Sequence, residues 1–322
     1  MPTKKQTKKL PVLYLIAPCY NEEKVLPVTY KLFEDKIIEL IKSKRISSDS
    51  RTLFVNDGSK DSTWEIICDL SRKSKYIEGI CLSRNRGHQN ALLAGLMEAK
   101  DLCDVTITLD CDGQHDINAV NGMLEKYEEG YEVVYGIRNS RTGDSFFKKV
   151  FSELYYKLLN ALGGEIVTNH ADYRMVSSKV LNAFSDFHEV NIFLRGLFPL
   201  VGFRSTTINY DQLERAAGSS HYNLSRMLTL AIDGITSLSI KPIRIITGIG
   251  VFVAFVSFIG VIYSIITFFL GKTVPGWASM TCTLCFVSGI QLISLGIIGE
   301  YVGKTYMETK QRPRYIISDK TF

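Results

Sequence analysis

The chain has 322 residues, of which 46% are hydrophobic and 22% are charged. This composition excludes a disordered or collagen-like chain, because the first has too few apolar residues and the second needs a glycine repeat. A formal net charge of +5 is modest and does not predict nucleic acid as a partner. The seven cysteines are scattered and odd in number, which favours reduced thiols over a disulfide framework.

The first part of the chain alternates short apolar runs with amphipathic segments. The apolar runs predict strands over 12–17, 52–55, 77–82, 105–109 and 132–135. Apolar residues at helical spacing predict helices over 25–41, 63–72, 88–99 and 117–128. This order of strands and helices favours an α/β fold with a mixed, mainly parallel sheet and helices on both faces.

Polar residues follow four of the predicted strands at their carboxyl ends. They are Tyr20, Asn21 and Glu22, then Asn56 and Asp57, then Arg84 and Asn85, and finally Asp110 and Asp112. Ligands of open parallel sheets bind beyond the carboxyl ends of the strands, so we expect one site built from four loops. Neither a G-x-G-x-x-G string after the first strand nor a P-loop string occurs, so neither a dinucleotide dehydrogenase nor a P-loop NTPase is supported.

The last of these loops has the chemistry of a site for a hard cation. Asp110 and Asp112 flank one residue, and Gln114 follows two positions later. Oxygen ligands at this spacing suit Mg²⁺ or Mn²⁺, and the metal keeps open positions for phosphates. An acidic turn without a metal is the alternative.

Two long stretches without a charged residue follow, at 245–271 and 273–299. About 20 apolar residues suffice to span a bilayer, so the sequence predicts two transmembrane helices. Basic residues flank the outer ends of the pair, whereas the short connection carries only Lys272. The positive-inside rule therefore predicts that the large domain and both termini are cytoplasmic. Two buried helices of a soluble protein are the alternative.

These features divide the chain into four expected parts. They are a cytoplasmic domain at 1–221, a juxtamembrane segment at 222–242, a two-helix hairpin at 243–303 and a polar cytoplasmic tail at 304–322. The juxtamembrane segment has apolar residues at helical spacing and basic flanks, which favours an amphipathic helix on the membrane surface over a core helix.

Four strings, in this order and spacing, resemble family 2 glycosyltransferases with the GT-A fold: APCYNE (17–22), NDGSKDST (56–63), SRNRGHQNAL (83–92) and LDCDGQHD (109–116). Two later strings resemble the polyprenyl-phosphate branch of that family, GIRNSRTGDSFFKK (136–149) and HADYRMVS (170–177). The branch includes dolichyl-phosphate mannose synthases and bactoprenol glucosyltransferases. The resemblance covers roughly residues 12–305, and the two predicted spans favour the bactoprenol type.

The resemblance implies a role for particular residues. It implies that the nucleotide sugar is bound by Pro18, Tyr20, Glu22, Asp57, Arg84 and Asp110. It implies that Mg²⁺ or Mn²⁺ is held by Asp110, Asp112 and Gln114. Catalytic roles would fall on Asp112 and Asp172. The phosphate of the acceptor would be bound by Arg138, Arg141, Lys148 and Ser152.

The reaction implied is the inverting transfer of a sugar from a nucleotide sugar to undecaprenyl or another polyprenyl phosphate, which supplies glycosylation of the cell envelope. UDP-glucose is the expected donor, with UDP-N-acetylglucosamine and GDP-mannose as alternatives. A phosphate monoester has its second pKa at about 6, so a strong general base is little needed, and Asp172 is expected to orient the sugar or stabilise charge. The resemblance also implies a homo-oligomer, a tetramer, in the inner membrane, and a flippase as a candidate partner.

Two other functions compete with this one. A processive polysaccharide synthase is disfavoured because no Q-x-x-R-W string occurs and two spans make a poor polymer channel. A catalytically silent membrane scaffold has no need for the carboxylates of Asp57, Asp110, Asp112 and Asp172, so these residues favour an enzyme.

Overall fold

The computed structural model describes the chain except for residues 1–8, 140–169, 190–191, 214–240 and 271–275. The chain forms two compact units. One contains Met1–Tyr156, Glu165–Asn223 and Pro313–Phe322, and the other contains Lys157–Gly164 and Leu224–Arg312.

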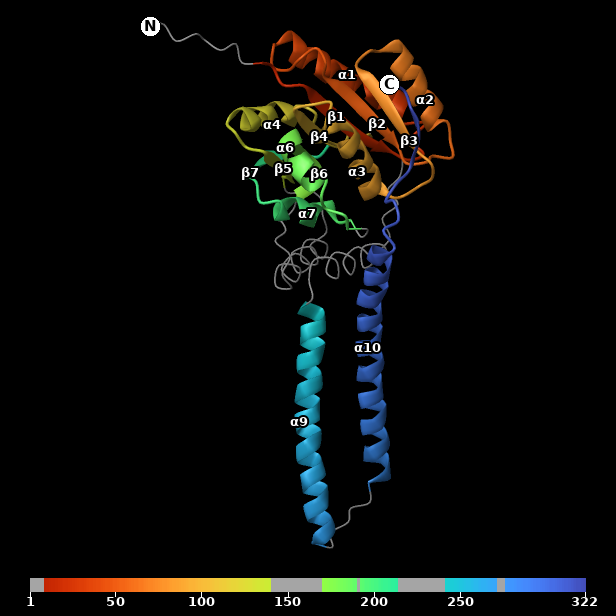
Figure 1. Ribbon diagram of the computed structural model, residues 1–322, viewed down its shortest axis with the longest axis vertical. Helices are drawn as coiled ribbons and strands as arrows, with labels where there is room; N and C mark the ends of the chain where they lie inside the picture. Colours follow the sequence, from red (N-terminus) through yellow and green to blue (C-terminus); the bar gives the residue numbers. More distant parts are fainter. Residues whose placement is uncertain (1–8, 140–169, 190–191, 214–240, 271–275) are drawn as a thin grey trace, which may run out of the picture. The chain divides into compact units, whose positions relative to one another are not determined.

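The first unit is built on an eight-stranded sheet with the order β7-β5-β6-β4-β1-β2-β3-β8 (Figure 1). The strands are β1 (Leu13–Cys19), β2 (Arg51–Asn56), β3 (Ile77–Leu82), β4 (Val105–Thr108), β5 (Val133–Arg138), β6 (His170–Ser177), β7 (Ser205–Tyr210) and β8 (Ile317–Lys320). Strands β1 to β4 are parallel to one another, as are β5 and β7, whereas β6 and β8 run antiparallel to their neighbours. The predicted mixed, mainly parallel sheet is confirmed.

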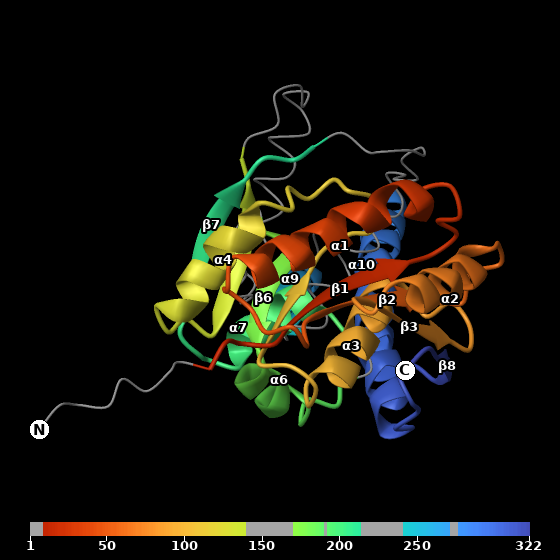
Figure 2. The same cartoon turned by 90° about the horizontal axis from the view of Figure 1, so that it is seen from above.

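Helices cover both faces of this sheet. They are α1 (Leu26–Lys42), α2 (Thr63–Lys73), α3 (His88–Ala99), α4 (Ala119–Glu128), α6 (Ser178–Phe184) and α7 (Leu194–Leu200). Alternate residues of a strand point to opposite faces, and Leu13, Leu15 and Ala17 of β1 join the core beneath α1. Figure 2 shows α1 and α3 on opposite sides of β1.

Helix α3 approaches the other face of the sheet closely at a glycine. A Cβ atom on Gly95 would lie 2.5 Å from Cγ2 of Ile16 and 2.8 Å from Cγ2 of Val55. Interiors are packed too densely to accept such an overlap, so the small residue sets the distance between α3 and strands β1 and β2. This close packing fixes the start of α3, which contributes two residues to the candidate site.

The end of the chain differs from the expected tail. Helix α10 continues to Thr309, and β8 then pairs antiparallel with β3 at the edge of the sheet. The hydroxyl oxygen of Thr321 accepts a hydrogen bond from the backbone N–H of Gly79 at 2.9 Å and another from the hydroxyl of Ser71 at 3.0 Å. The short polar sequence of β8 gives no strand signal of its own, because its strand conformation comes from the edge that it pairs with.

The second unit contains the helices α9 (Lys241–Phe269) and α10 (Trp277–Thr309). Each has a window long and apolar enough to cross a membrane, with mean hydropathy 2.1 over Lys241–Gly260 and 1.4 over Phe286–Thr309. None of either window is buried by the rest of the chain, so these are not the buried core helices of the alternative interpretation. The predicted amphipathic segment lies outside the described residues, apart from the start of α9.

Candidate active site

The carboxyl ends of the parallel strands β1, β2, β3 and β4 lie at one edge of the sheet. Cys19 at the end of β1 is paired with Asn56 at the end of β2, and Asn56 with Cys81 of β3. The backbone N–H of Leu109, just after β4, donates to the carbonyl oxygen of Ile16 at 3.1 Å. The polar loops after these strands are therefore neighbours in the structure.

The loops after β1 and β2 are joined by hydrogen bonds. The backbone N–H of Asn21 donates to the hydroxyl of Ser59 at 2.9 Å, and that of Glu22 donates to the hydroxyl of Thr63 at 2.9 Å. Pro18 is buried in β1, whereas Tyr20 is 41% exposed at the surface of the loop. These contacts give the proposed nucleotide-binding residues Pro18, Tyr20 and Glu22 a defined backbone beside the Asp57 loop.

Asp57 organises the loop after β3. Its buried carboxylate accepts hydrogen bonds from the backbone N–H groups of Arg86 at 2.7 Å and Gly87 at 2.9 Å. Burial raises the pKa of Asp57, and the two N–H groups offset part of that rise. Gly58 has φ +60°, and a Cβ atom there would lie 2.4 Å from the carbonyl carbon of Arg84, so the two loops touch through their backbones.

The acidic loop after β4 is held by a buried histidine. The backbone N–H of Asp110 donates to Nδ1 of His115 at 3.0 Å, and Nε2 of His115 lies 3.6 Å from Oδ2 of Asp110. The imidazole is stacked on Tyr173 with ring centroids 4.8 Å apart, and burial lowers the pKa of His115. The neutral ring thus accepts at Nδ1 and carries its proton at Nε2, facing the Asp110 carboxylate.

The donor set of this loop fits a divalent cation that is only partly coordinated by protein. Asp110 is partly exposed, and Oδ1 of Asp112 accepts from the backbone N–H of Gln114 at 3.0 Å. Among the described residues, no three histidine, cysteine or acidic side chains form a metal cage. Mg²⁺ typically uses one or two carboxylates together with water and substrate phosphates, so two carboxylates and an amide oxygen suit it.

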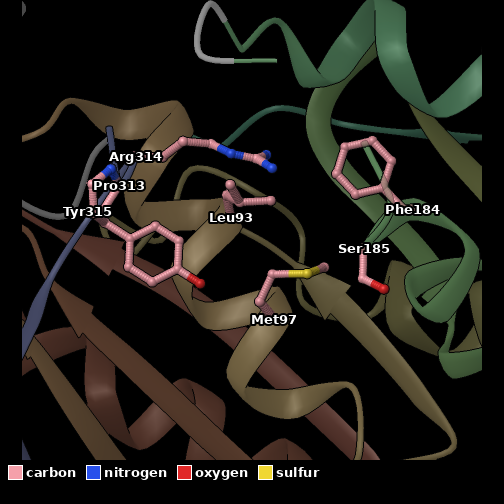
Figure 3. Close-up of a pocket in the computed structure, with 7 residues that line it drawn as sticks. All are labelled: Leu93, Met97, Phe184, Ser185, Pro313, Arg314 and Tyr315. Carbon is pink, nitrogen blue, oxygen red and sulfur yellow. The ribbon is translucent and has the colours of Figure 1, made fainter. Parts of the chain in front are cut away.

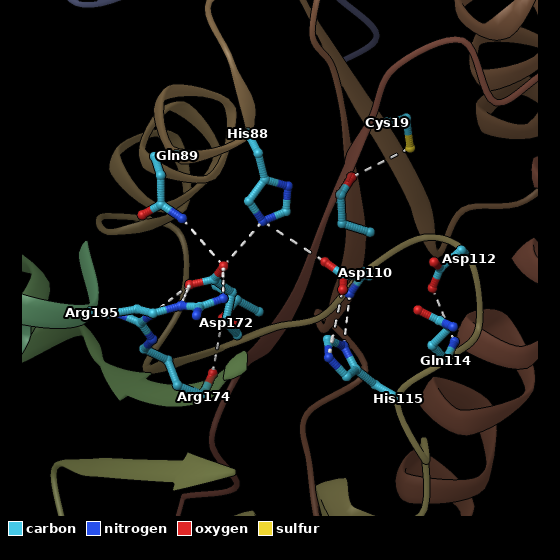
Figure 4. Close-up of polar contacts among 12 residues, drawn as sticks. Cys19, His88, Gln89, Asp110, Asp112, Gln114, His115, Asp172, Arg174 and Arg195 are labelled. Atoms are coloured by element: carbon cyan, nitrogen blue, oxygen red, sulfur yellow. Dashed lines mark hydrogen bonds and ion pairs between the residues drawn. The ribbon is translucent and has the colours of Figure 1, made fainter. Parts of the chain in front are cut away.

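The topology brings Asp172 to the same place. Strand β6 is antiparallel to β4, and Arg174 is opposite Thr108 at the end of β4. Asp172, two residues before Arg174, therefore lies beside the loop that carries Asp110, two residues after Thr108. Figure 4 shows His88 between the two carboxylates, with its Nε2 3.5 Å from Oδ2 of Asp172 and 3.8 Å from Oδ1 of Asp110.

Several donors surround the Asp172 carboxylate. Oδ1 accepts from Nε of Arg195 at 3.1 Å and from Nη2 of Arg174 at 3.1 Å. Oδ2 accepts from Nη2 of Arg195 at 2.9 Å and from Nε2 of Gln89 at 3.2 Å. Burial by itself raises the pKa of Asp172, but the Arg195 guanidinium and His88 bring it well below its usual range. Asp172 is therefore an anion at neutral pH.

Some of these groups could not be recognised from the sequence. His88, Gln89 and Arg174 lie within the quoted strings, where their role had no separate signal. Arg195 lies in α7, outside every string, and only the tertiary fold brings it to Asp172. A charged residue in the first turn of a short apolar helix was the one available hint.

The residues expected to bind the acceptor phosphate are only partly described. Arg138 is at the end of β5, where its Nε donates to the hydroxyl of Tyr210 at 3.1 Å. The other three lie outside the described residues: Arg141, Lys148 and Ser152. Arg84 is exposed beside the Asp57 loop.

One cavity of the structure is lined by none of the residues of the acidic loop (Figure 3). It is lined by residues of α3, of α6 and its C-terminal end, and of the segment after α10: Leu93, Met97, Phe184, Ser185, Pro313, Arg314 and Tyr315. The lining has no carboxylate and is mainly apolar, so this cavity is not the site defined by the strand ends.

Comparison with known proteins agrees with this fold. Residues 14–184 match the model of glycosyl transferase family 2, and residues 241–305 match the GtrB C-terminal hairpin. The chain therefore belongs to glycosyl transferase family 2, and the predicted family is confirmed. The hairpin match and the two apolar helices indicate association with a membrane.

Curated relatives are similar over nearly the whole chain. The uncharacterized glycosyltransferase YkoT of Bacillus subtilis is 44% identical over 307 residues, covering 95% of this chain and 91% of the relative. The bactoprenol glucosyl transferase of Shigella phage SfX is 36% identical over 308 residues, covering 95% and 98%. The prophage bactoprenol glucosyl transferase homolog of Escherichia coli is 37% identical over 305 residues, covering 94% and 97%.

Among solved structures, glucosyl-3-phosphoglycerate synthase from Mycobacterium tuberculosis is similar to 71% of this chain and 78% of its own, with 17% identity and a TM-score of 0.47.

Proposed function

We propose that this chain is a membrane-bound, inverting glycosyltransferase that moves glucose from UDP-glucose to undecaprenyl phosphate. The observation that carries the proposal is the pairing of an acidic strand-end loop with the arginine-bound Asp172, joined by His88, in a family 2 domain that bears the apolar hairpin. Glucose as the sugar and a polyprenyl phosphate as the acceptor rest on relatives named bactoprenol glucosyl transferases. UDP-N-acetylglucosamine and GDP-mannose remain the alternative donors.

The chemistry needs alignment and charge neutralisation more than proton removal. An oxygen of the acceptor phosphate forms a bond to the anomeric carbon while the bond from that carbon to the diphosphate breaks, and UDP leaves with the electron pair. The acceptor is already largely a dianion near pH 7, since its second pKa is about 6. Two anionic substrates must therefore be brought together, which basic side chains favour.

The residues of the site divide this work between them. The loops of Pro18, Tyr20, Glu22, Asp57 and Arg84 bind the nucleotide. A divalent metal, Mg²⁺ or Mn²⁺, held by Asp110, Asp112 and Gln114, would neutralise charge on the departing diphosphate. Asp172 lies on the other side of His88, next to the reacting sugar. The acceptor phosphate is bound by Arg138, at the end of β5, and by Arg141, Lys148 and Ser152.

The fold supports a two-span topology. Strand β8 follows both apolar helices in the chain, yet it pairs with β3, which precedes them, inside one compact unit. This pairing supports a chain that returns to the side of the membrane from which it left, with two crossings. Basic residues at the outer ends of the hairpin favour the cytoplasm for that side, by the positive-inside rule.

The experiment is a donor screen. Membranes that contain the protein are incubated with undecaprenyl phosphate, Mg²⁺ or Mn²⁺ and one radiolabelled nucleotide sugar, and label extracted into organic solvent is measured. We expect label from UDP-glucose alone, lost with EDTA and in Asp112→Asn. The matched control is Asp69→Asn, an exposed carboxylate on α2 paired with Arg72, which should retain transfer. A folded protein that labels lipid from none of the donors would exclude the reaction and favour the scaffold.

Assembly is proposed on resemblance alone. The protein is proposed to form a homo-oligomer, a tetramer by resemblance. A flippase that accepts the lipid-linked sugar is a candidate partner, because the transferase acts on one side of a membrane. Light scattering of the purified protein in detergent, compared with the monomer mass of 36.3 kDa, tests the oligomeric state.

A further inference from the structure

The acidic loop after β4 packs through His115 against two tyrosine rings of the sheet. His115 is 5% exposed and is stacked on Tyr173, with ring centroids 4.8 Å apart. Tyr210 meets both rings edge to face, with its centroid 5.5 Å from that of His115 and 5.0 Å from that of Tyr173. Tyr173 belongs to β6 and Tyr210 to β7, so the imidazole is held by the sheet and not only by its own loop.

A glycine in β5 makes room for the two tyrosine rings. A Cβ atom on Gly136 would lie 3.2 Å from Cε1 of Tyr210 and 3.3 Å from Cδ1 of Tyr173. It would also lie 2.9 Å from the carbonyl oxygen of Tyr173. A glycine inside a strand often marks such a close approach. The space that the rings need is therefore built into the pairing of β5 with β6.

Hydrogen bonds fix the loop on both sides of His115. The carbonyl oxygen of Gln114 accepts from the backbone N–H of Leu213 at 3.0 Å. The carbonyl oxygen of Asp116 accepts from the hydroxyl of Tyr173 at 2.9 Å. With its neighbours tied and its ring packed, His115 has one fixed position relative to the sheet.

The fixed imidazole meets Asp110 at two points. Nδ1 accepts the backbone N–H of Asp110 at 3.0 Å, so Nδ1 carries no proton and the proton of the neutral ring is on Nε2. Within the described part of the chain Nε2 has no hydrogen-bond partner, and Oδ2 of Asp110 lies 3.6 Å from it. A buried donor without a partner is costly. A movement of the carboxylate by about half an ångström would give an ordinary hydrogen-bond distance.

The two oxygens of the Asp110 carboxylate are therefore not equivalent. Oδ2 lies beside the buried His115, whereas Oδ1 lies 3.8 Å from Nε2 of His88, whose side chain is 44% exposed. Figure 4 shows the two histidines on different sides of Asp110. A carboxylate that binds a metal is in turn hydrogen-bonded by a neighbouring group, which sets its orientation. Oδ1 is thus the oxygen on the open side, where a cation can reach it.

We propose that His115 is a positioning residue for the metal: it donates from Nε2 to Oδ2 of Asp110 and so leaves Oδ1 for Mg²⁺ or Mn²⁺. This inference rests on the proposed function, because it assigns a supporting group to the metal site of that reaction. His115 touches neither the metal nor a substrate and acts only through Asp110. Loss of such a supporting group typically weakens metal binding by roughly 10- to 100-fold.

The test measures Mn²⁺ binding to the full-length protein in an uncharged detergent, with free Mn²⁺ followed by electron paramagnetic resonance. His115→Asn should raise the Kd roughly 10- to 100-fold, because asparagine can accept the Asp110 N–H but has no group at the place of Nε2. His115→Gln should lose less, since its amide nitrogen reaches that place. The matched control is Tyr210→Phe, which keeps the ring beside His115 and loses only the hydroxyl that contacts Arg138. It should bind Mn²⁺ as the wild type does, and thermal unfolding shows that each variant is folded.

A second measurement needs no variant. With ¹⁵N-labelled histidine, the buried ring should give a slowly exchanging Nε2–H signal that moves downfield when Mg²⁺ and UDP are added, because its hydrogen bond shortens. Loss of that proton would make His115 a metal ligand and would overturn the inference. An unchanged signal, a wild-type Kd in His115→Asn, or equal losses in His115→Asn and His115→Gln would also overturn it. A wild-type protein that binds Mn²⁺ no better than Asp112→Asn would instead refute the metal site of the proposed function.

Discussion

Thr321→Val should destabilise the transferase unit although it lies at the end of the chain. Thr321 stands just after β8, and its hydroxyl oxygen accepts the backbone N–H of Gly79 and the hydroxyl of Ser71. Valine has nearly the same shape but no acceptor, so the Gly79 N–H, in a partly buried strand, loses its partner. An unsatisfied donor of this kind costs about 1–3 kcal/mol.

The loss can be followed by heating the protein in detergent. For a unit of this size, about 1 kcal/mol corresponds to a shift of roughly 2–4 °C in Tm, so we expect Thr321→Val to lower the transition by several degrees. Ser318→Ala is the control on the same strand, because Ser318 is exposed and donates to the carbonyl oxygen of Cys81 at 3.2 Å. Equal transition temperatures for Thr321→Val and the wild type would refute the argument that β8 is an integral strand of the sheet.

Four further outcomes follow from the structure. Deleting residues 313–322 should weaken UDP-glucose binding, because the carbonyl oxygen of Ile316 accepts the N–H of Ser83 just before the Arg84 loop; unchanged affinity by calorimetry would contradict this. Gly95→Val should cost about 1–3 kcal/mol or more by overpacking, seen as a lower transition temperature than Gly95→Ala. The pKa of Asp172 is lowered on folding, so its stabilisation is complete above about pH 4, the usual carboxyl value, and is lost as pH falls through the folded pKa. Urea unfolding across acidic pH should therefore show a smaller decline for Asp172→Asn than for the wild type. EDTA should abolish transfer while leaving the circular dichroism spectrum unchanged, since the proposed metal site lies in a loop after β4; unfolding with EDTA would contradict this.

Local sequence patterns were sufficient to predict the central strands of the sheet and the helices that follow them. The predicted strand 77–82 and helix 88–99 coincide with β3 and α3, and the first two strands differ from β1 and β2 only at their ends. These segments are buried on both faces or amphipathic, so each carries its own periodic signal. The antiparallel strands β6 and β8 had no such prediction, because their pairing depends on edges formed by distant residues.

The candidate site could likewise be predicted only in part. Parallel strands end at one edge, so the sequence determined that the loops of Tyr20, Asp57, Arg84 and Asp110 would be neighbours, and long uncharged stretches determined the two apolar helices. Only the tertiary structure decided that Arg195 meets Asp172 and that the chain beyond α10 returns to pair with β3. Both contacts join residues far apart in sequence, with no local periodicity to announce them. They depend on where the completed sheet brings a side chain or leaves an unpaired edge.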